Sequence, residues 1–193
     1  MMEPINPEMI SAVLGPFGPL ENVRANWPLI ESALETRGIN SLATKIAAIA
    51  TVAVETGRFS PVRERGGPAY FTKHYEGRAD LGNNQPGDGA KFFGRGYIQI
   101  TGRGNYSEYG REIGVDLIAD PDLALDPAIG AGVLALFFRT KNIPRLADAS
   151  NWEAVRRRVN GGLEGWDRFS AYVGELSKAL QLAETTVGGD VQI

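Results

Sequence analysis

Apolar residues recur at helical spacing along most of the chain. The clearest case covers residues 40–57, which are apolar on nearly every side. Asn40 or Ser41 can cap the start of this segment, and Gly57 is a typical stop. A helix with so little polar surface must be covered by other elements, so the pattern predicts a central, buried helix.

Six further segments show the same periodicity, with glycine or polar residues at their ends: residues 7–15, 28–38, 105–114, 126–140, 150–160 and 167–184. Pro28 suits the first turn of the second of these segments. The pattern predicts a mainly α-helical domain.

Residues 57–96 differ, because glycine and proline interrupt them repeatedly and no helical pattern extends beyond a turn or two. Long irregular stretches in compact domains are usually functional or mobile. Residues 96–101 (GYIQIT) alternate and contain β-branched side chains, which predicts a short strand. The organisation is therefore a helical body with one long glycine-rich excursion and a small β element.

The composition narrows the possible chemistry. A chain of 193 residues fits one domain. It has no cysteine, which excludes disulfides, zinc–thiolate sites and cysteine nucleophiles, and its one histidine, His74, cannot form a multi-histidine metal site. We expect no metal and no cofactor. The net charge of −3 argues against nucleic acid as the main partner, because phosphate binding needs a basic surface.

No apolar run reaches the roughly 18 residues that a membrane span needs, and residues 1–10 lack the basic and apolar regions of a signal peptide. We therefore expect synthesis in the cytoplasm and no membrane insertion. We expect a lead-in segment at residues 1–20, one domain at residues 21–184 and a flexible tail at residues 185–193. The chain is compatible with one module of a longer protein.

Glu55 lies at the C-terminal end of the most apolar predicted helix. Desolvation and the negative end of the helix dipole both disfavour an ionised carboxylate there. A carboxyl group that keeps its proton near neutral pH is what a general acid requires. The position also fits the first solvated residue after a core helix, and position alone favours this second interpretation.

Glu64 follows nine residues later on an irregular segment. Such a segment can bring two carboxyl groups to the spacing of roughly 6.5 to 9.5 Å that inverting glycosidases use. The alternative is a surface glutamate paired with Arg63 or Arg65. Glu76 is a third candidate, with Arg78 as its ordinary ion-pair partner.

Residues 87–106 (GDGAKFFGRGYIQITGRGNY) contain six glycines but neither a Walker lysine nor a G-x-G-x-x-G motif that opens a helix. A sugar cleft fits this stretch better than a phosphate site, because glycine lets the backbone approach a ligand. Its neutral polar and aromatic side chains could contact sugar rings: Gln99, Thr101, Asn105, Tyr97 and Tyr106. A glycine-rich turn with its aromatic rings in the core fits equally well.

Three consecutive arginines, residues 156–158, lie on a predicted helix, which favours a solvated basic face. Asn160 precedes two glycines and suits either a helix stop or a ligand-binding loop. His74 is typical of an ordinary loop residue; its imidazole could assist chemistry, but nothing nearby in the sequence argues for that role.

Taken in order, these motifs resemble glycoside hydrolase family 19, which comprises plant-type chitinases and the lysozyme-like catalytic domains of bacteriophage endolysins. The matching blocks are ETG at 55–57, the motif GDGxxFxGRGxIQITGxxNY at 87–106, GVDLIADPDLALDP at 114–127, VNGGxE at 159–164 and DRxxxY at 167–172. They span about residues 41–175, and the block at 87–106 is the most specific. Residues 75–89 resemble phage lysins against actinobacterial hosts more than chitinases.

The resemblance implies a two-lobed, lysozyme-like helical fold with a central glycan cleft. It also implies that Glu55 is the general acid, that Glu64 is the general base and that Thr101 holds the attacking water. The polar residues that it places along the sugar subsites are Gln99, Asn105 and Asn160. Glu164 and Arg168 match a network behind the acid. Val54 departs from the family, because many members have histidine immediately before the acid, and so does Arg58, which replaces a glycine.

The function that the resemblance implies is that of a mycobacteriophage-type endolysin. Such an enzyme is a monomer that cleaves the β-1,4 bond between N-acetylmuramic acid and N-acetylglucosamine in peptidoglycan glycan strands. The cleavage inverts the configuration of the anomeric carbon. It lyses the host after a separate holin has permeabilised the membrane. Two alternatives stay open: a chitinase that acts on N-acetylglucosamine polymers, and a non-catalytic module that binds cell wall.

Overall fold

The structure is a computed structural model that describes residues 5–187, with side chains described through residue 181. Its α-helices are α1 (Pro7–Leu14), α2 (Leu20–Thr36), α3 (Leu42–Thr56), α4 (Pro68–Tyr75), α5 (Asp88–Lys91), α6 (Arg103–Ile113), α7 (Pro127–Thr140), α8 (Ile143–Asp148), α9 (Trp152–Asn160) and α10 (Trp166–Val187). Short 3-10 helices lie at Gly15–Phe17, Ala79–Leu81 and Pro121–Leu125. Strands β1 (Val62–Arg63) and β2 (Arg95–Gly96) pair antiparallel. The predicted fold class, mainly helical with a small β element, is confirmed.

Helix α3 is the centre of the larger lobe, as predicted. The Ser41 hydroxyl accepts a hydrogen bond from the Thr44 amide at 3.2 Å, and Gly57 ends the helix in the left-handed conformation. Residues 44–53 are all buried, and α3 packs against α2, α8, α9 and α10. Burial of this apolar surface is the main source of the lobe's stability. The C-terminal end of α3 therefore starts from a rigid support.

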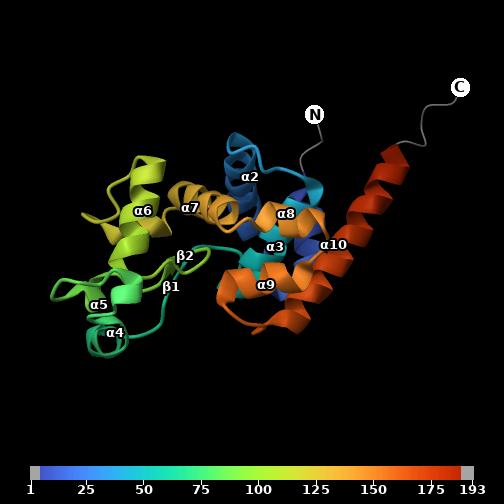
Figure 1. Cartoon of the computed structure of the whole chain (residues 1–193). Coiled ribbons are helices and arrows are strands. Elements are labelled where there is room, and N and C mark those ends of the chain that lie inside the picture. Colours follow the sequence, from blue (N-terminus) through green and yellow to red (C-terminus); the bar gives the residue numbers. More distant parts are fainter. Residues whose placement is uncertain (1–4, 188–193) are drawn as a thin grey trace, which may run out of the picture.

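The smaller lobe has its own hydrophobic cluster. Phe92, Tyr106 and Leu117 form part of this cluster together with residues of α7, which contacts both lobes. Helix α4 is fixed to the lobe by Phe71, whose ring stacks on Phe93 with centroids 4.1 Å apart. Figure 1 shows α4, α5 and α6 on one side of the molecule, α3, α9 and α10 on the other, and the two strands between them.

Two of the predicted elements are wrong in detail. Helix α2 begins at Leu20, so Pro28 lies inside this helix and not in its first turn. The predicted strand at residues 96–101 is mostly a turn: Gly96 ends β2 and Ile100 makes an isolated bridge to Arg95, but Gln99 between them has a positive φ of 52°. Alternation of apolar and polar residues also occurs in tight turns, so this pattern could not distinguish a strand from a turn at residues 96–101. Helix α8 was not predicted.

The ends of the chain add to the larger lobe. Ile10 and Leu14 of α1 are buried in its core, so the described part of the predicted lead-in packs with the domain. Helix α10 continues to Val187, beyond the predicted domain end at residue 184. Residues 1–4 of the lead-in and residues 188–193 of the predicted tail lie outside the described residues. Within residues 5–187, no helix combines the length and apolarity needed to cross a membrane.

Candidate active site

Glu55 lies at the end of α3, where the helix meets α9. Its side chain is 18% exposed, and its Oε1 forms an ion pair with the guanidinium of Arg156. Arg156 is buried, and its Nε donates to the Glu164 carbonyl at 2.6 Å. The carboxylate is thus partly covered and is held through one of its two oxygens by a residue 101 positions away.

The turn between α9 and α10 encloses this ion pair. The Asn160 side chain donates to the Glu164 carbonyl at 3.1 Å and accepts from the Gly162 amide at 2.9 Å. A Cβ on Gly165 would lie 2.8 Å from Val54 Cγ1, so this turn packs directly on α3. The Asn160 amide therefore shapes the turn, and the contact of Glu164 with Arg156 is made by its backbone carbonyl.

The arginine that contacts Glu55 was not predicted. Residues 156–158 were expected to form a solvated face, but Arg156 is only 2% exposed, whereas Arg157 and Arg158 are exposed. Arg168, predicted to belong to the network behind the acid, lies instead over the Phe17 ring at 4.8 Å. Arg156 lies four residues after Trp152 on the same face of α9, and that spacing was the signal available in the sequence.

Glu64 lies in the smaller lobe, directly after β1. Its backbone amide donates to the Gly94 carbonyl at 2.9 Å, which extends the pairing of β1 with β2. Both carboxylate oxygens accept hydrogen bonds: Oε2 from the Gly94 amide at 2.9 Å and Oε1 from the Tyr75 hydroxyl at 2.7 Å. Two donors from separate segments fix the direction of the carboxylate.

Gly94 lies directly beneath two polar side chains. A Cβ there would lie 3.0 Å from Glu64 Oε2 and 2.9 Å from Gln99 Oε1. The ends of the Glu64 and Gln99 side chains therefore both lie close to this glycine. The glycine at the start of the GRG motif therefore leaves room for the carboxylate of Glu64.

Gln99 and Thr101 lie in and after the turn that follows β2, and Asn105 lies in the first turn of α6. The Gln99 amide donates to the carbonyls of Val62 and Gly96 at 2.7 and 3.1 Å. The Thr101 hydroxyl donates to the Gln99 carbonyl at 3.0 Å, and the Asn105 amide donates to the Thr101 carbonyl at 2.7 Å. All three side chains are half-buried. The structure thus places these predicted site residues close to one another, and Gln99 also contacts Val62 of β1. Their hydrogen bonds hold the backbone of the turn.

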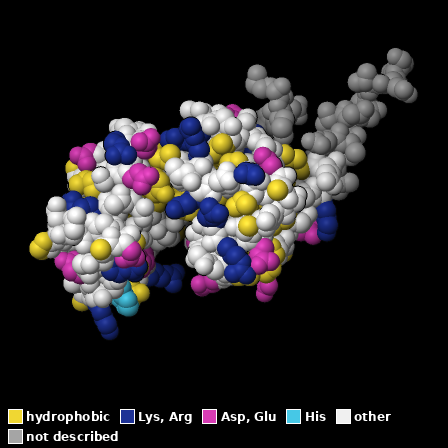
Figure 2. Space-filling view, viewed as in Figure 1, with side chains coloured by type: hydrophobic (Ala, Val, Ile, Leu, Met, Phe, Trp, Pro, Cys, Tyr) yellow, Lys and Arg dark blue, Asp and Glu magenta, His cyan; other side chains and the backbone are white. Residues whose placement is uncertain are grey.

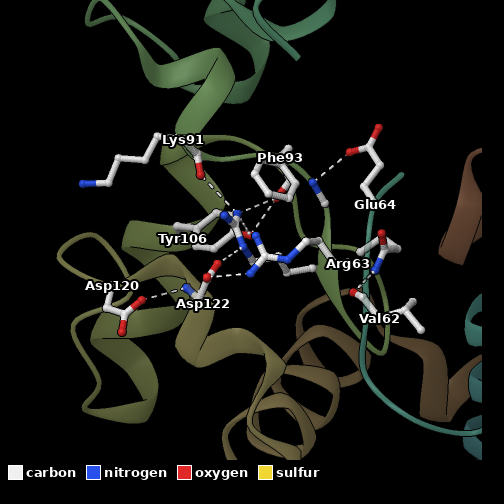
Figure 3. A network of polar contacts seen from close by, with 11 residues as sticks. Val62, Arg63, Glu64, Lys91, Phe93, Tyr106, Asp120 and Asp122 are labelled. Atoms are coloured by element: carbon white, nitrogen blue, oxygen red, sulfur yellow. Dashed lines mark hydrogen bonds and ion pairs between the residues drawn. The ribbon is translucent and has the colours of Figure 1, made fainter. Parts of the chain in front are cut away.

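Arg95 joins the turn to the rest of the smaller lobe through a network of polar contacts, whose members Lys91, Phe93 and Asp122 are labelled in Figure 3. Its Nε donates to Asp122 at 2.7 Å, and its Nη1 donates to the carbonyls of Lys91 and Phe93, each at 3.1 Å. The guanidinium also lies 3.7 Å from the centroid of the Phe93 ring. Arg95 is only 4% exposed, so this network is internal and holds the backbone next to Gly94.

Tyr97 and Tyr106 do not offer faces to a sugar, so this prediction is wrong. Tyr97 is 1% exposed and its hydroxyl donates to Asn26 at 2.5 Å; Tyr106 is fully buried and donates to the Phe93 carbonyl at 2.7 Å. Burial raises the pKa of Tyr106 to about 12. These rings fill the core, because an aromatic ring with a satisfied hydroxyl is stable there.

Glu76 and His74 lie on the far part of the same excursion. The two Glu76 oxygens accept hydrogen bonds from the Gly87 and Gly89 amides, each at 2.7 Å, so this carboxylate holds a backbone turn. His74 is exposed, and its ring lies 4.3 Å from that of Tyr70. Across the described chain, no three histidine, aspartate or glutamate side chains gather closely enough to hold a metal ion.

The two predicted catalytic carboxylates thus belong to different lobes. Residues 57–61 carry the chain from the end of α3 across to β1, and the molecular surface is indented between the lobes (Figure 2). Two cavities lie elsewhere: one of about 500 Å³ beside Ser41 and Lys45, and one of about 640 Å³ between α2, α6 and α7. Neither cavity is lined by Glu55 or Glu64.

Comparison with known proteins identifies the family of the chain. The family model described as chitinase class I matches residues 44–152, which include Glu55, Glu64 and residues 87–106. A glycosyl hydrolase family 19 domain-containing protein of Haemophilus influenzae is 38% identical over 97 residues, or 48% of this chain and 44% of that protein. A potato (Solanum tuberosum) endochitinase is 48% identical over 58 residues, or 30% of this chain and 18% of that protein. The matched region spans less than half the length of these relatives.

Solved structures show the same fold at low identity. The crystal structure of a bacterial family 19 chitinase has a TM-score of 0.66 and 19% identity, covering 90% of this chain and 95% of that chain. Chitinase C from Streptomyces griseus has a TM-score of 0.63 and 18% identity, covering 92% of this chain and 75% of that chain. Since the family model covers more than half of the residues, the chain belongs to the chitinase class I family, glycoside hydrolase family 19.

Proposed function

We propose that the chain is an inverting glycosidase in which Glu55 is the general acid and Glu64 the general base. The observation that carries the proposal is the placement of two constrained carboxylates on opposite lobes. Arg156 holds Glu55 by Oε1 only, which leaves Oε2 for a proton. Glu64 accepts hydrogen bonds at both oxygens, an arrangement that suits an ionised carboxylate.

The reaction follows from these two environments. A glycan in the cleft covers the exposed part of the Glu55 side chain, so that the carboxyl group meets the glycosidic oxygen away from bulk water. Glu55 then donates its proton to the glycosidic oxygen as the bond breaks. Glu64 takes a proton from a water that attacks the anomeric carbon from the opposite face, so the configuration inverts. Thr101, whose hydroxyl contacts the Gln99 carbonyl, is the proposed holder of this water.

For the substrate, we propose the β-1,4 bond between N-acetylmuramic acid and N-acetylglucosamine in peptidoglycan. The proposal is supported by residues 75–89, whose sequence resembles that of phage lysins. The corresponding biological role is that of an endolysin, made in the host cytoplasm and acting on the wall after a holin has permeabilised the membrane. A monomer is sufficient for this role, because both carboxylates come from one chain.

A chitinase is the second candidate. It is favoured by the curated relatives, several of which are named endochitinases, from maize, potato and tobacco. Peptidoglycan and chitin share the β-1,4-linked amino-sugar backbone and differ in the lactyl-peptide branch on alternate sugars. The cleft must therefore accept that branch for the first candidate and need not do so for the second.

The test compares products on peptidoglycan and on chitin oligomers by mass spectrometry. We expect reducing ends at N-acetylmuramic acid from peptidoglycan, and wild-type rates to fall at least about a thousandfold in Glu55→Gln and Glu64→Gln. Glu76→Gln is the control and should keep most activity, because its carboxylate binds only backbone amides. Preferred cleavage of chitin would favour the second candidate. Binding to cell wall without new reducing ends would indicate a non-catalytic module.

A further inference from the structure

Tyr75 is a polar contact of Glu64 that the sequence did not single out. It is the last residue of α4, and its hydroxyl donates to Glu64 Oε1 at 2.7 Å. Burial and this hydrogen bond raise the pKa of the Tyr75 phenol above its ordinary value, so the phenol stays protonated and remains a donor.

The backbone of Tyr75 is itself fixed. The Asn83 amide donates to the Tyr75 carbonyl at 2.8 Å, and the Asn83 Oδ1 accepts from the Arg103 amide at 2.7 Å. Asn83 is 1% exposed. This buried side chain therefore joins the end of α4 to the start of α6. It helps to fix the position of the Tyr75 backbone, and hence of the phenol, at the end of a helix of only eight residues.

The two donors to Glu64 differ in kind. The Gly94 amide belongs to the strand pairing and cannot turn away, whereas the Tyr75 hydroxyl rotates about its C–O bond. A rotatable hydroxyl can donate to an ionised carboxylate and can accept from a protonated one. Tyr75 is thus able to remain in contact with Glu64 in both protonation states of a general base.

We propose that Tyr75 is a positioning residue: its hydroxyl orients the Glu64 carboxylate and stabilises the ionised form of Glu64 during glycoside hydrolysis. The inference rests on the proposed function of Glu64 as the base. Tyr75 would act through Glu64 without touching the glycan. Its removal should therefore change the catalytic rate and the pH dependence more than substrate affinity.

Other charged and titratable groups lie around this pair. Tyr70 on α4 and Arg78 after α4 act electrostatically on Tyr75. Arg63 and Arg65 flank Glu64 in the sequence, but Arg63 is paired with Asp122 at 2.5 Å. Arg95 from β2 is paired with Asp122 as well. None of these groups is altered by removing the Tyr75 hydroxyl, so a change in pH dependence can be assigned to that group.

The experiment is Tyr75→Phe, which keeps the ring that stacks near Phe71 and removes only the donor. We expect kcat on peptidoglycan to fall about tenfold with KM changed less than about twofold. The acidic limb of the kcat/KM profile should move up by about one pH unit, since a carboxylate that loses a donor is protonated more easily. Tyr172→Phe, a hydroxyl deletion on α10, is the matched control and should leave both quantities unchanged.

A direct titration separates this inference from the proposed function. The ¹³C NMR signal of the Glu64 carboxyl carbon reports protonation of this group. The protonation should occur at higher pH in Tyr75→Phe than in wild type, whether or not the protein hydrolyses glycan. An unchanged titration, or an unchanged acidic limb, would overturn the inference. If Tyr75→Phe does not fold, site-specific 3-fluorotyrosine, a stronger donor, should move both midpoints to lower pH; no movement would equally overturn it.

Discussion

The two lobes hold their carboxylates by different means. Glu55 lies near the end of α3, whose buried residues belong to the main core, and its partner Arg156 comes from the distant helix α9. Glu64 follows a two-residue strand and is held by hydrogen bonds from Tyr75 and Gly94. In the larger lobe, the interactions that hold Glu55 in place therefore also stabilise the fold. In the smaller lobe, the site can be disturbed while the core around Phe92 and Tyr106 is kept.

The largest effect on stability is expected for Arg156→Ala in the larger lobe. It leaves the partly buried Glu55 carboxylate without its partner, so the free energy of unfolding should fall by about 3 kcal/mol. Chemical denaturation measures this change. The matched control is Arg157→Ala, which removes an exposed pair with Glu153 and should cost less than about 1 kcal/mol. If the two variants lost the same free energy of unfolding, the buried ion pair would contribute no more to stability than the exposed one.

Gly94→Ala should separate activity from stability in the smaller lobe. The added Cβ would lie 3.0 Å from Glu64 Oε2, so the carboxylate must move. We expect hydrolysis to fall by roughly tenfold, because a displacement of a few tenths of an ångström at the carboxylate disturbs the reacting geometry, with little change in the thermal unfolding midpoint. Gly67→Ala is the control, since an added Cβ there meets no heavy atom within 4 Å. Full activity of Gly94→Ala would mean that the Glu64 position is not critical.

Acid should weaken the smaller lobe through Asp88. Its hydrogen bonds from Arg103, of 2.7 to 2.9 Å, hold the pKa of this carboxyl below its ordinary value. The folded-state pKa is therefore lower than the unfolded one. The stabilisation is complete above the unfolded value of about 3.9 and disappears as the pH falls through the folded value. Thermal unfolding of wild type and Asp88→Asn should differ at pH 6 and converge in strong acid. A gap that persists at all pH values would contradict this origin.

The sequence predicted the larger lobe better than the site. Ser41, Gly57 and the apolar residues between them specify α3 locally, and the structure confirms it. The turn at Gln99 was mistaken for a strand, because its positive φ depends on hydrogen bonds to Val62 and Gly96 that no local pattern reveals.

Contacts between distant segments limited the prediction of the site. Arg156 looked like one of three solvated arginines, because burial depends on which face of α9 meets α3. Tyr75 gave no local signal at all, since its contact with Glu64 joins residues that are 11 positions apart in the sequence. Tyr97 and Tyr106 carried an aromatic signal that serves core packing equally well. Residue type alone could not distinguish a ring in the core from a ring in a cleft.

The stereochemistry of the first product tests the central claim most directly. If Glu55 and Glu64 act as an acid and a base on opposite sides of a bound β-1,4 glycan, the reducing end should be released as the α-anomer. Proton NMR during the first minutes of hydrolysis, before mutarotation, distinguishes the two anomers. Initial release of the α-anomer is the expected result, and initial release of the β-anomer would contradict the account.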